Sequence, residues 1–150
     1  MELILLTTDI NAPVQKCFDL SRNIDLHQQS MQQAKEKAID GKTCGLIELG
    51  ESVTWLARHF GCSFRMTNQI TVMEKPFRFI DEMTRGPFKS LRHLHQFNAR
   101  DNFTEMIDVF EFEAPFGFLG WIAEKTYLKY YMRRLLVKRN HFIKAIAEKP

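Results

Sequence analysis

The sequence lacks any apolar run long enough to cross a membrane, because no stretch approaches the required length of about 18 residues. Its short apolar start, Leu3 to Leu6, has neither a basic leader nor a secretory core. The cysteines Cys17, Cys44 and Cys62 match neither a disulfide framework nor a paired Cys-x-x-Cys metal site. We therefore expect a cytoplasmic protein with reduced thiols and no transmembrane segment.

Several catalytic and binding motifs are missing as well. No serine stands in a Gly-x-Ser-x-Gly context, no glycine-rich loop is suited to a phosphate, and no cysteine has an activating motif beside it. The net charge of +3 is too small to indicate nucleic-acid binding. Repeats, low-complexity tracts and linkers are absent, so we predict one domain over residues 1–150, with no cofactor and no nucleic-acid partner.

Phenylalanine, by contrast, is abundant. Thirteen Phe stand against three Tyr and two Trp, in a chain that is 45% hydrophobic and 26% charged. Because phenylalanine supplies bulk without a polar group, this composition suits a broad apolar interior or a pocket lined with rings.

Hydrophobic periodicity changes along the chain and predicts the order of the elements. Residues 2–10 are rich in β-formers, and helical spacing follows over 14–21 and from residue 24 to about 34. Over residues 36–113 the period is two and turn signals recur, which indicates an antiparallel meander. Helical spacing returns over 117–147, which predicts a C-terminal helix of about 30 residues and about 45 Å. Such a helix needs a sheet that curls around it.

Four segments resemble one protein superfamily. They are GKTCGLIELGESVTWLARHFG at 41–61, PFRFIDEMTRGPF at 76–88, the pair His93 and His95, and DVFEFEAP at 108–115 followed by YMRRLL at 131–136. With the element order, they resemble the SRPBCC proteins, the START and birch-pollen-allergen-like superfamily, over nearly the whole chain. The sequence is most similar to the bacterial polyketide cyclase/dehydrase-like or cell-division-inhibitor-like branch. The resemblance implies an α+β helix-grip fold, a curved antiparallel sheet of about seven strands (β-α-α-β6-α) around a long C-terminal helix.

The resemblance also implies a ligand cavity between that sheet and that helix. The superfamily includes lipid carriers, hormone receptors and cyclases, so a small lipophilic ligand is the partner it implies. Members of the branch are in some cases paired with an epimerase-like, NAD-binding domain, absent from these 150 residues, which makes such a protein a further candidate partner. The oligomeric state stays open, since sheet edges permit a dimer without requiring one.

Strand alternation places five ionisable side chains in register with apolar ones: His59, Asp81, His93, His95 and Asp108. Because such groups are costly in a core unless paired or hydrated, a polar cluster in a pocket is one explanation. The other is a strand phase wrong by one residue, which would turn a His or Asp to solvent. His93 and Asp108 are the candidates for catalysis, with histidine as a general base. A metal site from the two nearby histidines and an aspartate is conceivable, but a single His-x-His is a frequent accident, so we expect no metal.

The predicted ligand-binding residues combine this polar set with apolar neighbours on the strands and the C-terminal helix. They are Trp55, His59, Met66, Phe79, Asp81, Met83, His93, His95, Phe97, Asp108, Phe110, Trp121 and Tyr130. The aromatic members have a plainer explanation as core residues. In a helix-grip fold, however, sheet and helix cannot meet everywhere, and the same rings would then line the cavity.

The C-terminal helix carries a basic stripe of Lys125, Lys129 and Arg133, four residues apart. It has three explanations: a solvated face, a surface for an acidic partner or a membrane, and a nucleic-acid surface. Our first hypothesis is a module that binds a lipophilic or amphiphilic small molecule in the cavity. The alternatives are a cyclase/dehydratase-type enzyme that uses a His/Asp pair in the same cavity, and a protein- or membrane-surface interaction module that uses the basic helix.

Overall fold

The computed structural model describes residues 1–117, 122 and 127–150. Its strands form one antiparallel sheet in the order β1-β7-β6-β5-β4-β3-β2. The strands are β1 (Glu2–Ile10), β2 (Lys37–Gly41), β3 (Ser52–His59), β4 (Cys62–Glu74), β5 (Arg78–Arg85), β6 (Ser90–Ala99) and β7 (Thr104–Glu113). The described helices are α1 (Val14–Ser21), α2 (Ile24–Ser30), the 3-10 turn η1 (Gln32–Ala34) and α4 (Lys129–Ala147).

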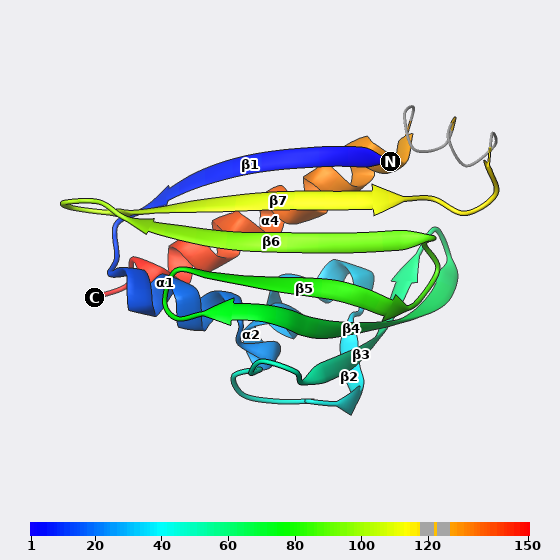
Figure 1. Ribbon diagram of the computed structural model, residues 1–150, viewed down its shortest axis with the longest axis horizontal. Helices are drawn as coiled ribbons and strands as arrows, with labels where there is room; N and C mark the ends of the chain where they lie inside the picture. Colours follow the sequence, from blue (N-terminus) through cyan, green and yellow to red (C-terminus); the bar gives the residue numbers. More distant parts are fainter. Residues whose placement is uncertain (118–121, 123–126) are drawn as a thin grey trace.

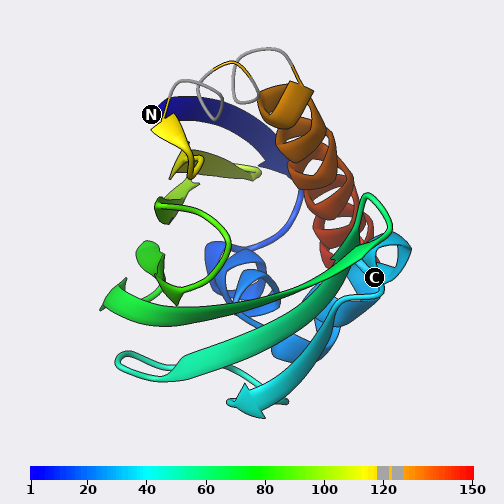
Figure 2. The same cartoon turned by 90° about the vertical axis from the view of Figure 1, so that its right-hand side faces the viewer.

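The sheet curls strongly, and α4 crosses its open side (Figures 1 and 2). Helices α1 and α2 pack beside the C-terminal half of α4 and close one end of the curl (Figure 1). The predicted α+β helix-grip fold is therefore confirmed, including its element order.

Strands β6 and β7 alternate between buried and half-exposed residues along most of their length. In β6 the buried residues are Leu91, His93, His95 and Phe97, which is the predicted set. Asp108 occupies the matching face of β7, directly opposite His95. The predicted phase of these strands is thus correct, and a one-residue error that would turn the histidines to solvent is excluded.

Strand β4 departs from the predicted alternation at one point. Strict alternation would place Val72 on the same face as Ile70, but the pairing with β5 shifts between these two residues. The bulge inserts one extra residue, so Val72 pairs with Ile80 while Met73 packs against the core. Alternation therefore fails only beyond the bulge, and Met66, which precedes it, keeps its predicted face on the cavity.

Helix α2 is shorter than predicted. It begins after Asn23, whose side-chain oxygen accepts a hydrogen bond from the Leu26 backbone amide at 3.0 Å. It ends at Ser30, and one 3-10 turn follows before Lys35 adopts a left-handed φ of 50°. The predicted extension to residue 34 is therefore a tighter turn.

Helix α4 begins at Lys129, whereas the predicted C-terminal helix began at residue 117. Residues 118–121 and 123–126 of that prediction lie outside the described residues.

The hydrophobic core forms two clusters, one toward each end of the concave face. The first includes Ile10, Phe18, Phe97, Met106 and Ile143, and the second includes Ile4, Leu91, Phe110, Phe112 and Leu136. Each strand or helix that has residues in both clusters carries polar residues between its residues of the first cluster and those of the second.

Candidate functional site

The concave face of the sheet and α4 surround a cavity of about 320 Å³. Apolar side chains make up most of its wall, among them Val53, Trp55, Ile70, Phe110 and Leu136. Both the volume and this character match those of small-molecule binding sites in proteins.

A layer of polar side chains separates the two apolar clusters of the core. Two elements show this: β6 places the buried His93 and His95 between Leu91 and Phe97, and α4 places two buried polar residues, Arg139 and Asn140, between Leu136 and Ile143. We call this set the polar layer; its members are Thr8, Asn68, Asp81, His93, His95, Asp108, Arg139 and Asn140.

Asp108 is the centre of the polar layer and is 0% exposed. Its Oδ1 accepts a hydrogen bond from His93 Nε2 at 2.8 Å, and its Oδ2 accepts one from Asn140 Nδ2 at 2.7 Å. His95 Nδ1 lies 3.3 Å and the Arg139 guanidinium 3.6 Å from Oδ1. Burial alone would raise the pKa of Asp108, but hydrogen bonds from the two histidines and the charge of Arg139 hold it well below its ordinary value. Asp108 is therefore an anion that orients the groups around it.

His93 is a neutral imidazole at neutral pH. Burial, reinforced by the neighbouring His95, lowers its pKa to about 4 despite the opposing effect of Asp108. Because a carboxylate can only accept, His93 Nε2 carries the hydrogen, and Nδ1 keeps a free lone pair. The ring is also held by stacking, with its centroid 3.7 Å from that of His95.

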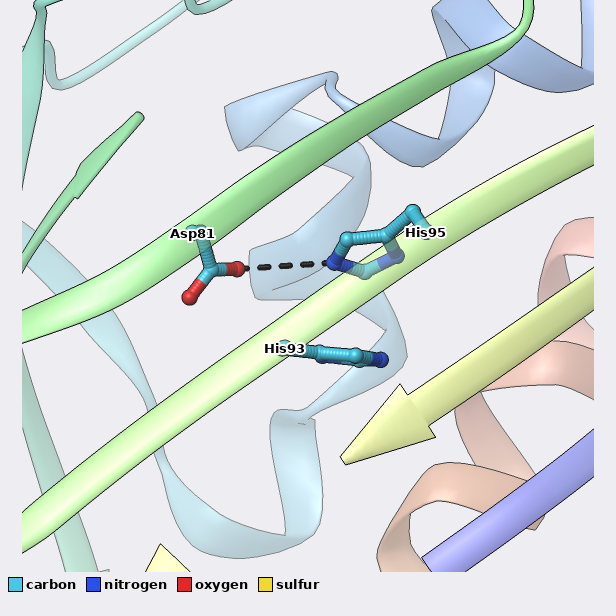
Figure 3. Close-up of side chains that lie close together, drawn as sticks. All are labelled: Asp81, His93 and His95. Carbon is cyan, nitrogen blue, oxygen red and sulfur yellow. Dashed lines mark hydrogen bonds and ion pairs between the residues drawn. The ribbon is translucent and has the colours of Figure 1, made fainter. Parts of the chain in front are cut away.

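Asp81 and His95 both line the cavity and face each other on its wall (Figure 3). Its Oδ2 is 3.5 Å from His95 Nε2, and its Oδ1 accepts a hydrogen bond from Asn68 Nδ2 at 2.8 Å. Burial would raise the pKa of Asp81, but the contact with His95 and the charges around it keep the pKa below its ordinary value. Within the described part of the chain, the buried Asn68 Oδ1 has no hydrogen-bond partner.

Three of these residues have the composition of a metal centre. Asp81, His93 and His95 each offer one ligand atom, and these atoms lie within 4.8 Å of one another. All three side chains line the cavity, and Figure 3 shows Asp81 of β5 facing His95 of β6, with His93 beside them on β6. The two imidazoles and the carboxylate are thus the described groups best placed to hold a metal ion.

His59 lies on the cavity wall but outside the polar layer. Its Nδ1 is 2.6 Å from the Tyr131 hydroxyl, and burial lowers its pKa. The tautomer of the imidazole decides which of the two groups donates this hydrogen bond. Phe60 and Tyr127 pack against Tyr131 and are each 56% exposed, so they form an aromatic rim beside this second polar point.

The structure brings many of the predicted ligand-binding residues to the cavity. Those on its wall are Trp55, His59, Met66, Phe79, Asp81, His93, His95 and Phe110.

Four of the predicted residues lie elsewhere among the described residues. Asp108 sits behind the two histidines, and Phe97 is packed in the core, where its ring meets that of Phe18 at 5.6 Å. Met83 packs beside Gly86 without reaching the cavity wall. Tyr130 is 66% exposed because the 100° turn per helical residue directs its neighbour Tyr131 inward instead. Trp121 lies outside the described residues.

No family model matches this sequence, and no curated protein matches it either. Solved structures do match this chain. Protein TTHA0849 from Thermus thermophilus superposes with a TM-score of 0.75 at 14% identity, over 98% of this chain and 100% of that one. Major latex-like protein 151 from Panax ginseng gives 0.70 at 13% identity, over 99% and 98%. Ara h 8.0201 gives 0.64 at 10% identity, over 96% and 98%.

This chain has the birch-pollen-allergen-like helix-grip fold. The identities of 13% and 10% are low, so the likeness concerns the fold alone.

Sequence reasoning missed four members of the polar layer in this helix-grip fold, namely Thr8, Asn68, Arg139 and Asn140. None of the four was predicted as a site residue, and two of them, Arg139 and Asn140, lie on the predicted C-terminal helix. A signal was available, because both follow Leu136 and precede Ile143 at spacings of three or four residues, within the buried stripe of α4.

The basic stripe of α4 is partly neutralised within the chain. Lys129 forms an ion pair with Glu2 at 2.9 Å, while Arg133 is exposed, and Lys125 lies outside the described residues. None of the helices in the described ranges is long and apolar enough to span a membrane.

Proposed function

We propose that this protein binds a lipophilic or amphiphilic small molecule in the cavity between the sheet and α4. The observation that carries the proposal is an apolar cavity of about 320 Å³ with polar-layer residues grouped on its wall. The apolar body of the ligand would lie against Trp55, Phe110 and Leu136, and its polar end would meet Asp81 and the two histidines.

The energetics favour an apolar ligand with few polar groups. A body that removes about 200 Å² of apolar surface from water gains about 5 kcal/mol before the costs of association. The polar layer already satisfies most of its hydrogen bonds internally, so it orients the ligand more than it adds affinity.

The first experiment is native mass spectrometry of protein purified from its own host, compared with the denatured mass. We expect one co-purifying amphiphile per chain, identified after extraction. If the protein is empty and a panel of lipids and metabolites also fails to raise its melting temperature, the binding proposal is wrong.

One observation favours an enzyme of the cyclase/dehydratase kind as a second candidate, namely the 2.8 Å contact between His93 and Asp108. This function belongs to the polyketide cyclase-like branch that the sequence resembles. A pKa of about 4 makes His93 a weak base near neutral pH, so the binding function is the better supported one. A bell-shaped pH profile with a candidate substrate, lost in His93→Ala, would favour the enzyme.

The remaining proposals receive less support. Binding of an epimerase-like, NAD-binding protein rests only on the resemblance to that branch. A surface role for the basic helix is weakened by the ion pair of Lys129 with Glu2.

A further inference from the structure

We propose that Asp81, His93 and His95 bind one divalent first-row transition-metal ion at the polar end of the cavity. Their ligand atoms already lie within 4.8 Å of one another on the cavity wall (Figure 3). The inference does not depend on the identity of the organic ligand, because it concerns the protein and the ion alone.

The hydrogen bonds behind the two imidazoles are those of metal-binding histidines. Such histidines almost always donate the second ring N–H to a carboxylate or carbonyl, which fixes the tautomer. Asp108, fully buried behind the wall, accepts from His93 Nε2 at 2.8 Å and lies 3.3 Å from His95 Nδ1. The nitrogens left for an ion are then His93 Nδ1 and His95 Nε2.

The spacing requires only a small closure. With metal–ligand bonds of about 2.0–2.2 Å, neighbouring ligand atoms of a tetrahedral site lie roughly 3.3–3.6 Å apart. The 3.5 Å between His95 Nε2 and Asp81 Oδ2 already has this value. With one ligand atom from each side chain no gap exceeds 4.8 Å, so side-chain rotations need to shorten the longest gap by roughly 1 Å.

Asn68 supplies a second, independent observation. It is only 7% exposed and lines the cavity, and its Nδ2 orients the Asp81 carboxylate at 2.8 Å. Its Oδ1 has no partner among the described residues, and an unsatisfied buried acceptor costs about 1–3 kcal/mol. A water molecule on the ion would donate to this oxygen and remove that cost.

The charge of the polar layer also favours a cation. Asp81 and Asp108 bring two negative charges to the polar layer, whereas the guanidinium of Arg139 brings one positive charge. His95 lies between the two carboxylates, with its Nε2 3.5 Å from Asp81 Oδ2 and its Nδ1 3.3 Å from Asp108 Oδ1. With the ring hydrogen on Nδ1, directed at Asp108, the lone pair of Nε2 is free to bind the ion next to Asp81.

The ligand set indicates which ions fit. Two imidazole nitrogens and one carboxylate oxygen suit Zn²⁺, Fe²⁺ or Co²⁺, whereas Mg²⁺ and Ca²⁺ prefer oxygen ligands alone. Three protein ligands leave open coordination positions that face the cavity, where an oxygen atom of an organic ligand can bind.

The test is calorimetric titration of Zn²⁺ into the full chain after dialysis against a chelator. We expect one ion per chain. The affinity for Zn²⁺ should fall about a hundredfold or more in Asp81→Asn and in His93→Ala. Asn68→Ala should weaken binding about tenfold, as for other groups that orient metal ligands. Mg²⁺ should give no heat at the same site.

Two controls separate this site from adventitious binding. His59→Ala removes another histidine of the same cavity wall and should leave the affinity within about threefold of wild type. The double variant Cys44→Ser, Cys62→Ser removes both exposed thiols and should do the same. Absence of binding, equal binding by Asp81→Asn, or loss of binding in the cysteine variant would each overturn the proposal.

Folding and ligand binding are measured on the same samples. Asp81→Asn keeps the acceptor for Asn68 and can donate to His95, so circular dichroism should show a native fold. Native mass spectrometry of the organic ligand is scored separately, so failure of the metal site and failure of the cavity proposal give different results.

Discussion

His93 and His95 pack ring against ring with centroids 3.7 Å apart and planes tilted by 35°, and both approach the same oxygen of Asp108. They are two residues apart on β6 and therefore share one face of the sheet. The stack presents two ring edges to the cavity and two to the buried carboxylate. This relationship makes Asp108 the residue on which the geometry of the site depends.

Asp108→Asn is expected to lower the free energy of unfolding by about 3 kcal/mol, because it leaves the buried Arg139 guanidinium without its anion. Urea denaturation followed by circular dichroism measures the change. Asp101→Asn, at an exposed turn, is the matched control and should change stability by less than about 0.5 kcal/mol. Equal stability of the two variants would show that the polar layer is not held by Asp108.

Ala57→Phe should abolish ligand binding without disturbing the polar layer. Ala57 lies on the cavity wall, and a phenyl ring there occupies much of the 320 Å³. Ala99→Phe places the same ring on an exposed position of β6 and should bind the co-purifying ligand like wild type. The ratio of bound to empty protein in native mass spectra is the readout, and full occupancy in Ala57→Phe would place the ligand outside the cavity.

The pKa of His59 is expected below its ordinary value of 6.5, because burial disfavours the charged imidazole. The unfolded chain then binds more protons than the folded one below pH 6.5, so this residue lowers stability as the pH falls through that value. Nuclear magnetic resonance titration of the His59 ring measures the pKa directly.

The stability effect of His59 is isolated by comparing wild type with His59→Gln across the same pH range. The decline below pH 6.5 should be shallower in the variant, since glutamine does not titrate. A parallel decline in both proteins would mean that His59 keeps its ordinary pKa in the fold.

Phe60→Asn should weaken ligand binding while stability stays equal or rises by up to about 1 kcal/mol. Phe60 and Gly61 form the two-residue turn between β3 and β4, and Phe60 has a left-handed φ of 54°, which asparagine adopts more easily. The loss of binding is expected because the Phe60 ring lines the cavity and packs on Tyr131.

The control for Phe60→Asn is Phe77→Asn, an exposed phenylalanine in the β4–β5 turn that does not reach the cavity. It should leave ligand affinity unchanged and gain no stability, because its φ is not left-handed. Reduced stability with unchanged affinity in Phe60→Asn would show that the ring serves only to hold the turn.

The sequence was sufficient to place the strand residues of the site. Alternation put Asp81, His93 and His95 on the concave face, because a strand has a period of two and one face must be apolar enough to be buried. It failed at Val72, where a bulge adds one residue to β4. A bulge depends on the pairing with the neighbouring strand, so the sequence around Thr71 alone does not predict it.

Contacts between elements distant in the sequence were decided by the tertiary structure. Periodicity shows that α4 has a buried stripe, but which residues it meets depends on how the sheet curls beneath it. Arg139 and Asn140 contact Asp108 because α4 passes over the concave face at the level of that residue. The same placement of α4 directs Tyr131, rather than Tyr130, toward His59. Local spacing thus determined which faces are buried in this protein, while the curvature of the sheet decided which buried groups meet, because that curvature is the sum of pairings along all seven strands.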